Sequence, residues 1–276
     1  MIRDIIDKKR KVLIGVVHLP SLRRALIEGR DAIERVLEIA IDDCRKLEEA
    51  GFDGIIVENY NDAPYLVRER DLGILSLINL AVRECINSTS IPVGLNILRN
   101  SAIESYIIAY VSGAKFIRVN AFVEVLITDS GIIEPAAPSL SILRAHYPGV
   151  EVFADILCKH SASLYFAYLS HLTNYDNALR TIVRDAIERG KADALIVTGS
   201  RTGEPPSTSL LQSVKRYSLI PILIGSGLTP ENANVLLKVA DGAIVGSYIK
   251  IGGKAGGRVD IERAQKLVKL IRAIFT

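Results

Sequence analysis

The stretch "IPILIGSGLTPENANVLLKVADGAIVGSYI" (residues 220–249) contains two short apolar runs separated by a segment of helical character. Thr229 is a typical N-cap and Pro230 suits the first turn of a helix, so a helix start is expected after the first run. The two runs, 220–227 and 241–249, are rich in β-branched and apolar residues, which is typical of strands covered on both faces. The stretch therefore predicts a strand, a helix and a second strand of a parallel sheet.

The same alternation recurs along the whole chain. Between the apolar runs lie segments with helical spacing, such as "RDAIERVLEIAIDDCRKLEEAG" (30–51), which ends in a glycine stop signal. Eight alternations in 276 residues favour a (β/α)8 TIM barrel, an α/β fold that we expect to form a single domain over residues 1–276. A doubly wound open sheet is the alternative, because the sequence does not show whether the first and last strands pair. The strands are expected at 11–19, 52–60, 91–98, 114–122, 150–157, 192–200, 220–227 and 241–249.

The composition is that of a globular protein and offers little for nucleic-acid or membrane partners. Hydrophobic residues make up 49% and aromatic residues 6%, the net charge of +3 is spread along the chain, and the basic run "DKKRK" (7–11) is expected on a solvated surface. Cys44, Cys85 and Cys158 match neither a zinc pattern nor a disulfide framework, and the first two are expected to be reduced core thiols. Without a transmembrane-length run or a signal-peptide layout, we expect a cytoplasmic protein; a homo-oligomer is compatible with the sequence.

Two connections are longer than a barrel requires. Residues 124–135 hold two apolar runs around Asp129-Ser130-Gly131, which predicts a small hairpin, and residues 158–177 form a second extended segment. Both follow the carboxyl ends of strands, the side on which barrel enzymes carry their active sites. We expect lids there, with surface padding as the alternative.

Polar side chains stand at the ends of the first six predicted strands. Because a strand exposes alternate residues to one side, His18, Glu58, Asn96, Asn120, Asp155 and Thr198 could face the lumen together. Each could instead cap a helix or bind a loop amide, but buried charges are costly unless paired, so the set favours an organised pocket. The catalytic candidates are His18, Glu58, Asp155 and Lys159, and the substrate-binding candidates are Asn59, Asn96, Arg118, Asn120, His160, Thr198 and Thr202.

Each catalytic candidate has a chemical role that its side chain could fill. Glu58 or Asp155 could act as general acid or base, and His18 could shuttle a proton. Lys159 could bind an anion or, with a depressed pKa, form a Schiff base. Metal binding by His18, Glu58 and Asp155 is the alternative, but no local ligand spacing supports it.

Glycines gather after the last two strands. Gly225, Ser226 and Gly227 follow the seventh strand, and Gly246 and Ser247 end the eighth. Phosphate sites of barrels often use these two loops, since backbone N–H groups approach phosphate oxygens most closely where side chains are missing. The five residues are the predicted phosphate site, and a plain strand–turn–helix junction is the alternative. The basic segment "KIGGKAGGRVD" (250–260) is expected to be flexible and could close over an anion.

Several segments together resemble the BtpA family, over about residues 11–265. The more specific ones are "VENYNDAPY" (57–65) and "VGLNILRN" (93–100), accompanied by "FIRVNAF" (116–122) and "DILCKHSASL" (155–164). The resemblance implies a barrel related to ribulose-phosphate-binding enzymes such as phosphoribosylanthranilate isomerase. The resemblance to that isomerase would imply a Cys as the general base at the end of strand 1 and an Asp as the general acid at the end of strand 6. This chain has His18 and Thr198 at these two strand ends.

The leading hypothesis is an isomerase or lyase that acts on a small phosphorylated metabolite without a cofactor, since no redox cofactor motif is present. A non-catalytic assembly factor on a barrel scaffold is the second hypothesis. A flavin-binding barrel that uses the same phosphate loops is the third.

Overall fold

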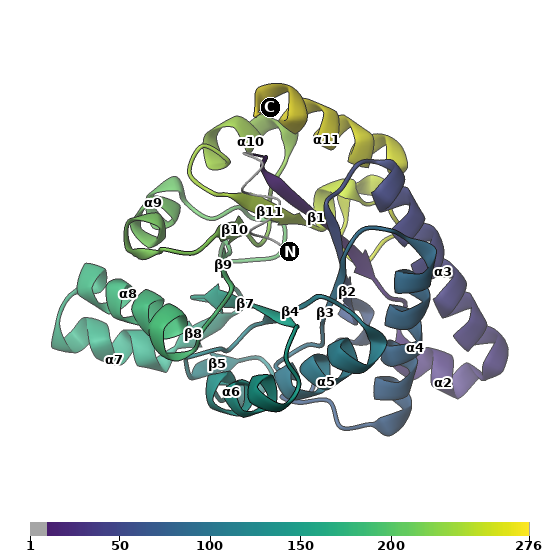
Figure 1. Ribbon diagram of the computed structural model, residues 1–276, viewed down its shortest axis with the longest axis horizontal. Helices are drawn as coiled ribbons and strands as arrows, with labels where there is room; N and C mark the ends of the chain where they lie inside the picture. The colour runs from purple at the N-terminus through teal and green to yellow at the C-terminus, as the bar shows by residue number, and fades with distance from the viewer. Residues whose placement is uncertain (1–9, 276) are drawn as a thin grey trace.

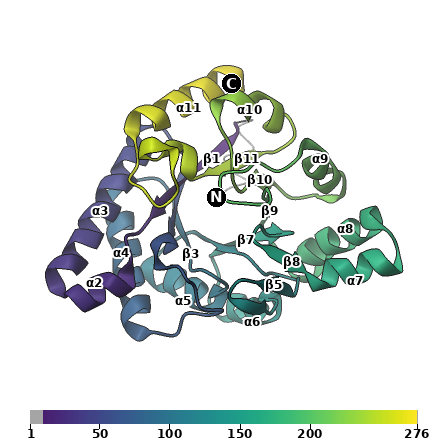
Figure 2. The same ribbon diagram turned by 180° about the vertical axis from the view of Figure 1, so that it is seen from behind.

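The computed structural model, which describes residues 10–275, is a closed barrel surrounded by helices (Figures 1 and 2). Within this range, eight parallel strands are hydrogen-bonded in the order β1-β11-β10-β9-β7-β4-β3-β2. The ring closes where β1 pairs with β11, with Val12 opposite Gly242 and Gly15 opposite Val245. This pairing confirms the barrel and excludes the open sheet. The barrel strands are β1 (Val12–His18), β2 (Gly54–Glu58), β3 (Val93–Asn96), β4 (Phe116–Val119), β7 (Glu151–Ile156), β9 (Ala194–Val197), β10 (Ile222–Ile224) and β11 (Gly242–Val245).

Helices follow the barrel strands and form an outer layer (Figure 1). Among the described residues, no helix is both long and apolar enough to cross a membrane. Residues 7–9 of the basic run lie outside the described range. The helices are α2 (Leu22–Glu28), α3 (Arg30–Glu49), α4 (Leu72–Ser88), α5 (Ala102–Ser112), α6 (Ala137–His146), α7 (Leu164–Leu172), α8 (Tyr175–Arg184), α9 (Thr208–Tyr217), α10 (Pro230–Leu236) and α11 (Ile261–Ile274), with short turns η1 (Tyr60–Asp62), η2 (Asp185–Arg189), η3 (Ser247–Ile249) and η4 (Ile251–Gly253).

The apolar core has two layers, separated by the wall of the barrel. Inside the barrel, the rings of Phe116 and Phe153 stack with their centroids 4.7 Å apart. Gly94 is needed beside them, because a Cβ there would lie 2.5 Å from the Phe116 ring. Outside, strands and helices share a larger cluster that includes the buried thiols of Cys44 and Cys85, as expected. The interior cluster consists of Val12, Ile14, Val16, Ile56, Phe116, Phe153, Ala194, Ile196, Leu223 and Ile244.

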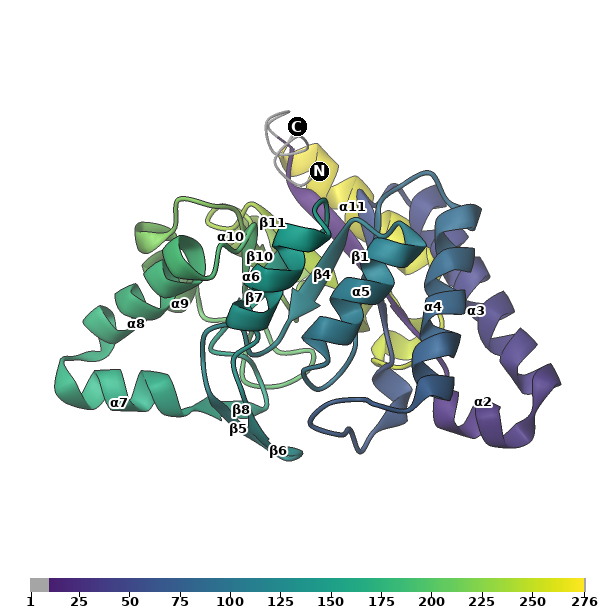
Figure 3. The same ribbon diagram turned by 60° about the horizontal axis from the view of Figure 1, so that its bottom comes forward.

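A second, small sheet lies on the carboxyl side of the barrel, beneath β7 in the view of Figure 3. Its strands are β5 (Leu126–Thr128), β6 (Gly131–Ile133) and β8 (Ser161–Ser163), in the order β6-β5-β8. The β5–β6 pair confirms the predicted hairpin. The sequence did not indicate β8, which comes from the next long connection and pairs antiparallel with β5.

The basic segment 250–260 is anchored to α3. Lys250 is completely buried, with its Nζ 3.6 Å from Oδ2 of Asp43. Arg258 Nε donates to the other oxygen of Asp43 at 3.0 Å, and the backbone N–H of Gly256 donates to His18 Nδ1 at 3.0 Å. The expectation of a free segment whose cations close over an anion is therefore wrong for Lys250, which lies in the core because Asp43 holds it there.

Candidate active site at the barrel mouth

The polar residues at the strand ends continue the inward-facing rows of the barrel core. In β1, His18 follows the interior residues Val12, Ile14 and Val16 in steps of two, and in β2 Glu58 follows Ile56. The same alternation places Asn96, Arg118, Asn120, Asp155 and Thr198 above the apolar interior. All seven side chains are buried, so the top of the barrel holds a layer of polar and charged groups.

Arg118 lies at the centre of this layer, between two carboxylates. Its Nε and Nη2 donate to Oδ1 and Oδ2 of Asp155 at 3.1 and 3.0 Å, and its Nη1 lies 3.6 Å from Oε1 of Glu58. Burial alone would lower the pKa of Arg118, but the charges of Asp155 and Glu58 outweigh it and raise this pKa above its usual value. Arg118 is therefore a fixed, charged group.

Asp155 is saturated with hydrogen bonds. Besides the three from Arg118, it accepts one from Asn120 Nδ2 at 2.6 Å and one from the Cys158 thiol at 3.1 Å. Burial, followed by the charge of Asp155, raises the pKa of Cys158 well above its ordinary value, so this thiol stays protonated. Asp155 thus orients Arg118 and Asn120 and does not line the cavity itself.

One carboxylate oxygen of Glu58 has no hydrogen bond to any of the residues that the structure describes. Oε1 accepts from Asn96 Nδ2 at 3.1 Å, whereas Oε2 lies 3.8 Å from His18 Nε2, which is beyond hydrogen-bond length. His18 Nδ1 accepts the N–H of Gly256, so in the neutral ring Nε2 carries the proton and faces Glu58. Burial, then the charges of Lys250 and Lys159, lower the pKa of His18 well below its ordinary value.

Lys159 follows β7 at the barrel mouth. Its backbone N–H donates to Thr198 Oγ1 at 3.0 Å, but its Nζ makes no hydrogen bond or ion pair with any residue that the structure describes. Burial, followed by the charge of Arg118, lowers the pKa of Lys159, against the opposing effect of Glu58 and Asp155.

The cavity at the mouth has two adjoining compartments. The larger one is about 260 Å³, and the smaller one, about 40 Å³, lies against the loops after β9, β10 and β11. Five residues line both compartments: Glu58, Tyr60, Arg118, Lys159 and Thr202. The larger compartment is also lined by Ala63, Tyr65, Asn96, Leu98, Arg99, Asn120, Asp129, Cys158 and His160, and the smaller by Val16, His18, Gly203, Gly225, Ser226, Gly227, Gly246, Ser247 and Ala255.

The smaller compartment offers backbone donors. In the described part of the chain, the N–H groups of Ser226, Gly227 and Gly246 have no hydrogen-bond partner. The hydroxyl of Ser226 is occupied, because it donates to the carbonyl of Glu204 at 2.8 Å. Gly227 has a packing reason as well: its φ is +72°, and a Cβ would lie 2.2 Å from the nitrogen of Pro205.

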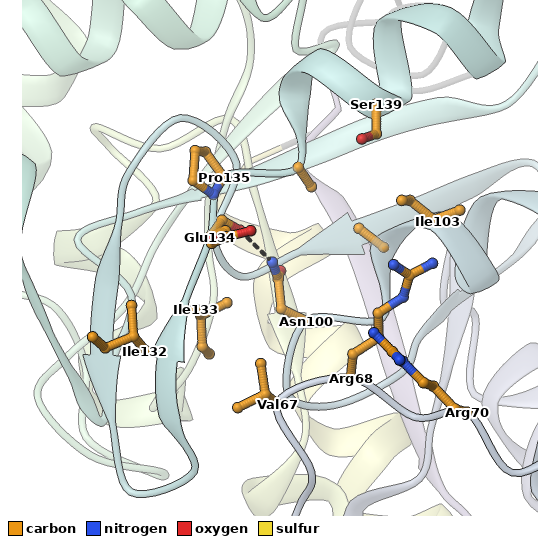
Figure 4. A pocket seen from close by; sticks show the side chains of 12 residues that line it. Val67, Arg68, Arg70, Asn100, Ile103, Ile132, Ile133, Glu134, Pro135 and Ser139 are labelled. Carbon is orange, nitrogen blue, oxygen red and sulfur yellow. Dashed lines mark hydrogen bonds between the residues drawn. The ribbon is translucent and has the colours of Figure 1, made fainter.

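The hairpin of the small sheet is fixed to the loop after β3 at two points. At the hairpin tip, Arg99 Nη2 pairs with Asp129 Oδ1 at 2.8 Å. At its base, Asn100 Nδ2 donates to the carbonyl of Glu134 at 2.9 Å (Figure 4). Asn100 and Glu134 also line a separate cavity of about 450 Å³. Figure 4 shows their contact among the other side chains that line this cavity. Both anchors come from the loop after β3, so this loop sets the position of the hairpin.

Most of the residues expected to form the site line one cavity. Three do not: Asn59 accepts the backbone N–H of Leu98 at 2.9 Å, Thr198 holds the backbone of Lys159, and Asp155 supports Arg118. His160 Nε2 accepts the N–H of Thr202 at 3.1 Å, which joins the loops after β7 and β9.

Sequence reasoning missed several lining residues, above all Tyr60 and Tyr65. The Tyr60 ring lies 4.4 Å from the His18 ring, and the Tyr65 hydroxyl donates to the carbonyl of Tyr60 at 2.6 Å. Both lie in the segment "VENYNDAPY", whose resemblance to a family pattern was the available signal. Among the described residues, no group of three or more His, Cys, Asp or Glu side chains is arranged to hold a metal ion.

Solved structures resemble this fold at low sequence identity. The (S)-3-O-geranylgeranylglyceryl phosphate synthase from Thermoplasma acidophilum, in complex with its substrate sn-glycerol-1-phosphate, matches with a TM-score of 0.60 at 16% identity. The match covers 99% of this chain and 98% of that one. At this identity the likeness shows the fold alone, which is that of a TIM-barrel protein.

Sequence relatives are closer and span nearly the whole chain. An uncharacterised protein of Pyrococcus furiosus is 43% identical over 274 residues, which cover 98% of each chain. The photosystem I biogenesis protein BtpA of Synechocystis is 37% identical over 259 residues, 93% of this chain and 86% of that protein. Since the model of the BtpA family also matches residues 9–273, this chain belongs to the BtpA family.

Proposed function

We propose that this protein is an enzyme that acts on a small phosphorylated metabolite held at the carboxyl ends of the barrel strands, with isomerase or lyase chemistry. One observation carries the proposal: a small compartment with free backbone N–H groups adjoins a larger polar compartment, and Glu58, Arg118 and Lys159 lie at their boundary. A phosphate bound in the small compartment would hold the atoms a few bonds away against these three side chains.

In this proposal each group of site residues has a distinct role. The N–H groups of Ser226, Gly227 and Gly246 bind phosphate oxygens. Glu58, through its free oxygen Oε2, is the general base, and Arg118 stabilises negative charge that develops on a substrate oxygen. Asp155 and Asn120 position Arg118 and the cavity wall, and His18 stays neutral beside Glu58. Proton transfer at a carbon atom next to a carbonyl is one reaction that such a pairing of base and cation can catalyse.

The similarly folded glycerol-phosphate enzyme supports the substrate class, because it was solved with a phosphorylated three-carbon compound. The name of the Synechocystis relative favours a second candidate, an assembly or stability factor that uses the barrel as a scaffold. The two differ in what Glu58→Gln does: an enzyme loses turnover while the fold and phosphate binding remain, whereas a scaffold keeps its biological activity.

Inorganic phosphate tests the proposed binding compartment. A ligand that binds only the folded state raises Tm, so phosphate should raise Tm above the value in chloride of equal ionic strength. Gly246→Ala should reduce this shift, because its methyl group would point into the compartment, 3.4 Å from His18 Cε1. Gly257→Ala is the matched control, since its methyl group would also meet its nearest neighbour at 3.4 Å, outside the compartment. Equal phosphate shifts in all three proteins, or none in any, would contradict the proposal.

A further inference from the structure

Lys159 occupies an unusual position among the charged groups of the mouth. Arg118 is locked between two carboxylates, Lys250 is buried against Asp43, and Arg99 is paired with Asp129. Lys159 lines both compartments, yet in the described chain its Nζ has neither an ion pair nor a hydrogen bond. A lysine with a purely structural role would be expected to form an ion pair with a carboxylate. The carboxylates of Glu58 and Asp155 are close enough to raise the pKa of Lys159, yet neither forms an ion pair with it.

The surroundings of Lys159 make its proton easier to remove than that of an ordinary lysine. Burial and the permanent charge of Arg118 both disfavour a second cation there, and they lower the pKa of Lys159. Arg118 itself cannot give up its proton, so it remains beside the amine as the group that would stabilise a developing oxyanion. The free oxygen of Glu58 lies on the same boundary and can transfer protons.

We propose that Lys159 forms a Schiff base with the carbonyl carbon of a phosphorylated ketone or aldehyde bound across the two compartments. This inference rests on the proposed function, and it specifies the substrate class. The neutral Nζ attacks the carbonyl carbon, a C–N bond forms, and the carbonyl oxygen takes up a proton. That oxygen leaves as water after a second protonation, which gives a protonated imine; relative to the ammonium form of Lys159, no proton is gained or lost overall.

The imine then acts as an electron sink for the neighbouring carbon. Glu58 removes a proton from that carbon to give an enamine, or from a β-hydroxyl group so that the C–C bond breaks and its electron pair moves to the imine nitrogen. In the cleavage route, the carbon that carried the β-hydroxyl leaves as an aldehyde or ketone. In both routes a proton, returned by Glu58, then adds to the enamine carbon and re-forms the imine, and addition of water to this imine releases the carbonyl product and restores the lysine. The sequence needs neither an oxidant nor a reductant.

Borohydride trapping tests the covalent step. The full chain is incubated with dihydroxyacetone phosphate or glyceraldehyde 3-phosphate, each with and without sodium borohydride, and its intact mass is measured. The expected result is one adduct per chain, equal in mass to the probe minus one oxygen atom, and peptide mapping should place it on Lys159. Inorganic phosphate should compete, and Lys159→Arg, which keeps the charge, should lower the yield at least tenfold. Lys250, which is completely buried against Asp43, should stay unlabelled and is the internal control.

Two results would overturn the inference. One is the absence of an adduct with both probes under conditions in which inorganic phosphate still raises Tm; the proposed phosphate site would then stand without the Schiff base. The other is labelling spread over several lysines that phosphate does not suppress. Mapping of the wild-type adduct decides the question even if Lys159→Arg does not fold. A failure of phosphate to bind at all is a separate result, which would contradict the proposed function.

Discussion

Lys250→Met should change how the stability of the protein depends on pH. Lys250 is completely buried, and its Nζ is 3.6 Å from Asp43 Oδ2, too far for a hydrogen bond. Burial lowers the pKa of Lys250 from its ordinary value of 10.5 to about 8, although Asp43 opposes this shift. A difference of this size corresponds to roughly 3 kcal/mol, at about 1.4 kcal/mol for each pKa unit.

Whether the free energy of unfolding rises or falls with pH follows from the number of protons that the folded and the unfolded chain bind. Between pH of about 8 and 10.5, the folded chain has released the proton of Lys250 while the unfolded chain still holds it. The unfolded state therefore binds more protons, and the free energy of unfolding rises with pH across this window. Below about pH 8 both states are charged, and the cost of burying the cation is fully present.

Urea denaturation at intervals from pH 7 to 10.5 measures the effect. The variant lacks this rise, so its unfolding free energy relative to wild type should fall by about 3 kcal/mol between pH 8 and 10.5. The substitution does not leave Asp43 without partners, because its carboxylate still accepts hydrogen bonds from Arg258 Nε and from the backbone N–H of Val259. Lys254→Met, which removes an exposed lysine of the same segment, controls for the loss of a charge. If the two variants show the same pH dependence, the reasoning about Lys250 is refuted.

Three further outcomes are expected. Gly227→Ala should destabilise the protein by about 1–3 kcal/mol more than Gly252→Ala in urea denaturation, because both have positive φ but only Gly227 meets another backbone closely; equal losses would contradict the close approach. His18→Gln should lessen the loss of stability as the pH falls below about 6.5, since the folded wild type resists protonation of His18 while the unfolded chain accepts the proton; unchanged acid sensitivity would count against a buried neutral imidazole. Asp129→Asn should speed amide hydrogen exchange in residues 126–133, yet cost under about 1 kcal/mol of overall stability, because the Asp129 side chain in its pair with Arg99 is 65% exposed; a large global loss would show that the pair does more than hold the hairpin.

The alternation of strands and helices, which favoured a barrel, could be predicted because the strands are marked by local composition. Each strand is an apolar run of β-branched residues, and the period of two along it carries His18 and Glu58 to the inner face. Closure could not be predicted, since the pairing of Val12 with Gly242 joins opposite ends of the chain without a local signal. Arg118 was expected near the site, but its place between Asp155 and Glu58 depends on three different strands.

The remaining features depend on long-range contacts. Ser161–Ser163 has the composition of a loop, and it becomes a strand only through pairing with β5. The glycine-rich basic segment 250–260, which begins with Lys250, was expected to be flexible and able to close over an anion. Lys250 lies in the core because Asp43, on a helix far away in the sequence, presents a buried carboxylate to it.

The small sheet over the mouth joins two connections that the chain makes separately. β5 is its central strand, so β6 from the same connection and β8 from the next one both depend on it for their hydrogen bonds. Replacing either connection alone, as in loop grafting between homologues, would leave the other with an unpaired edge. The two connections are thus constrained to be inherited together, and a chimera that changes the specificity of this barrel would have to exchange residues 124–135 and 158–177 as one unit.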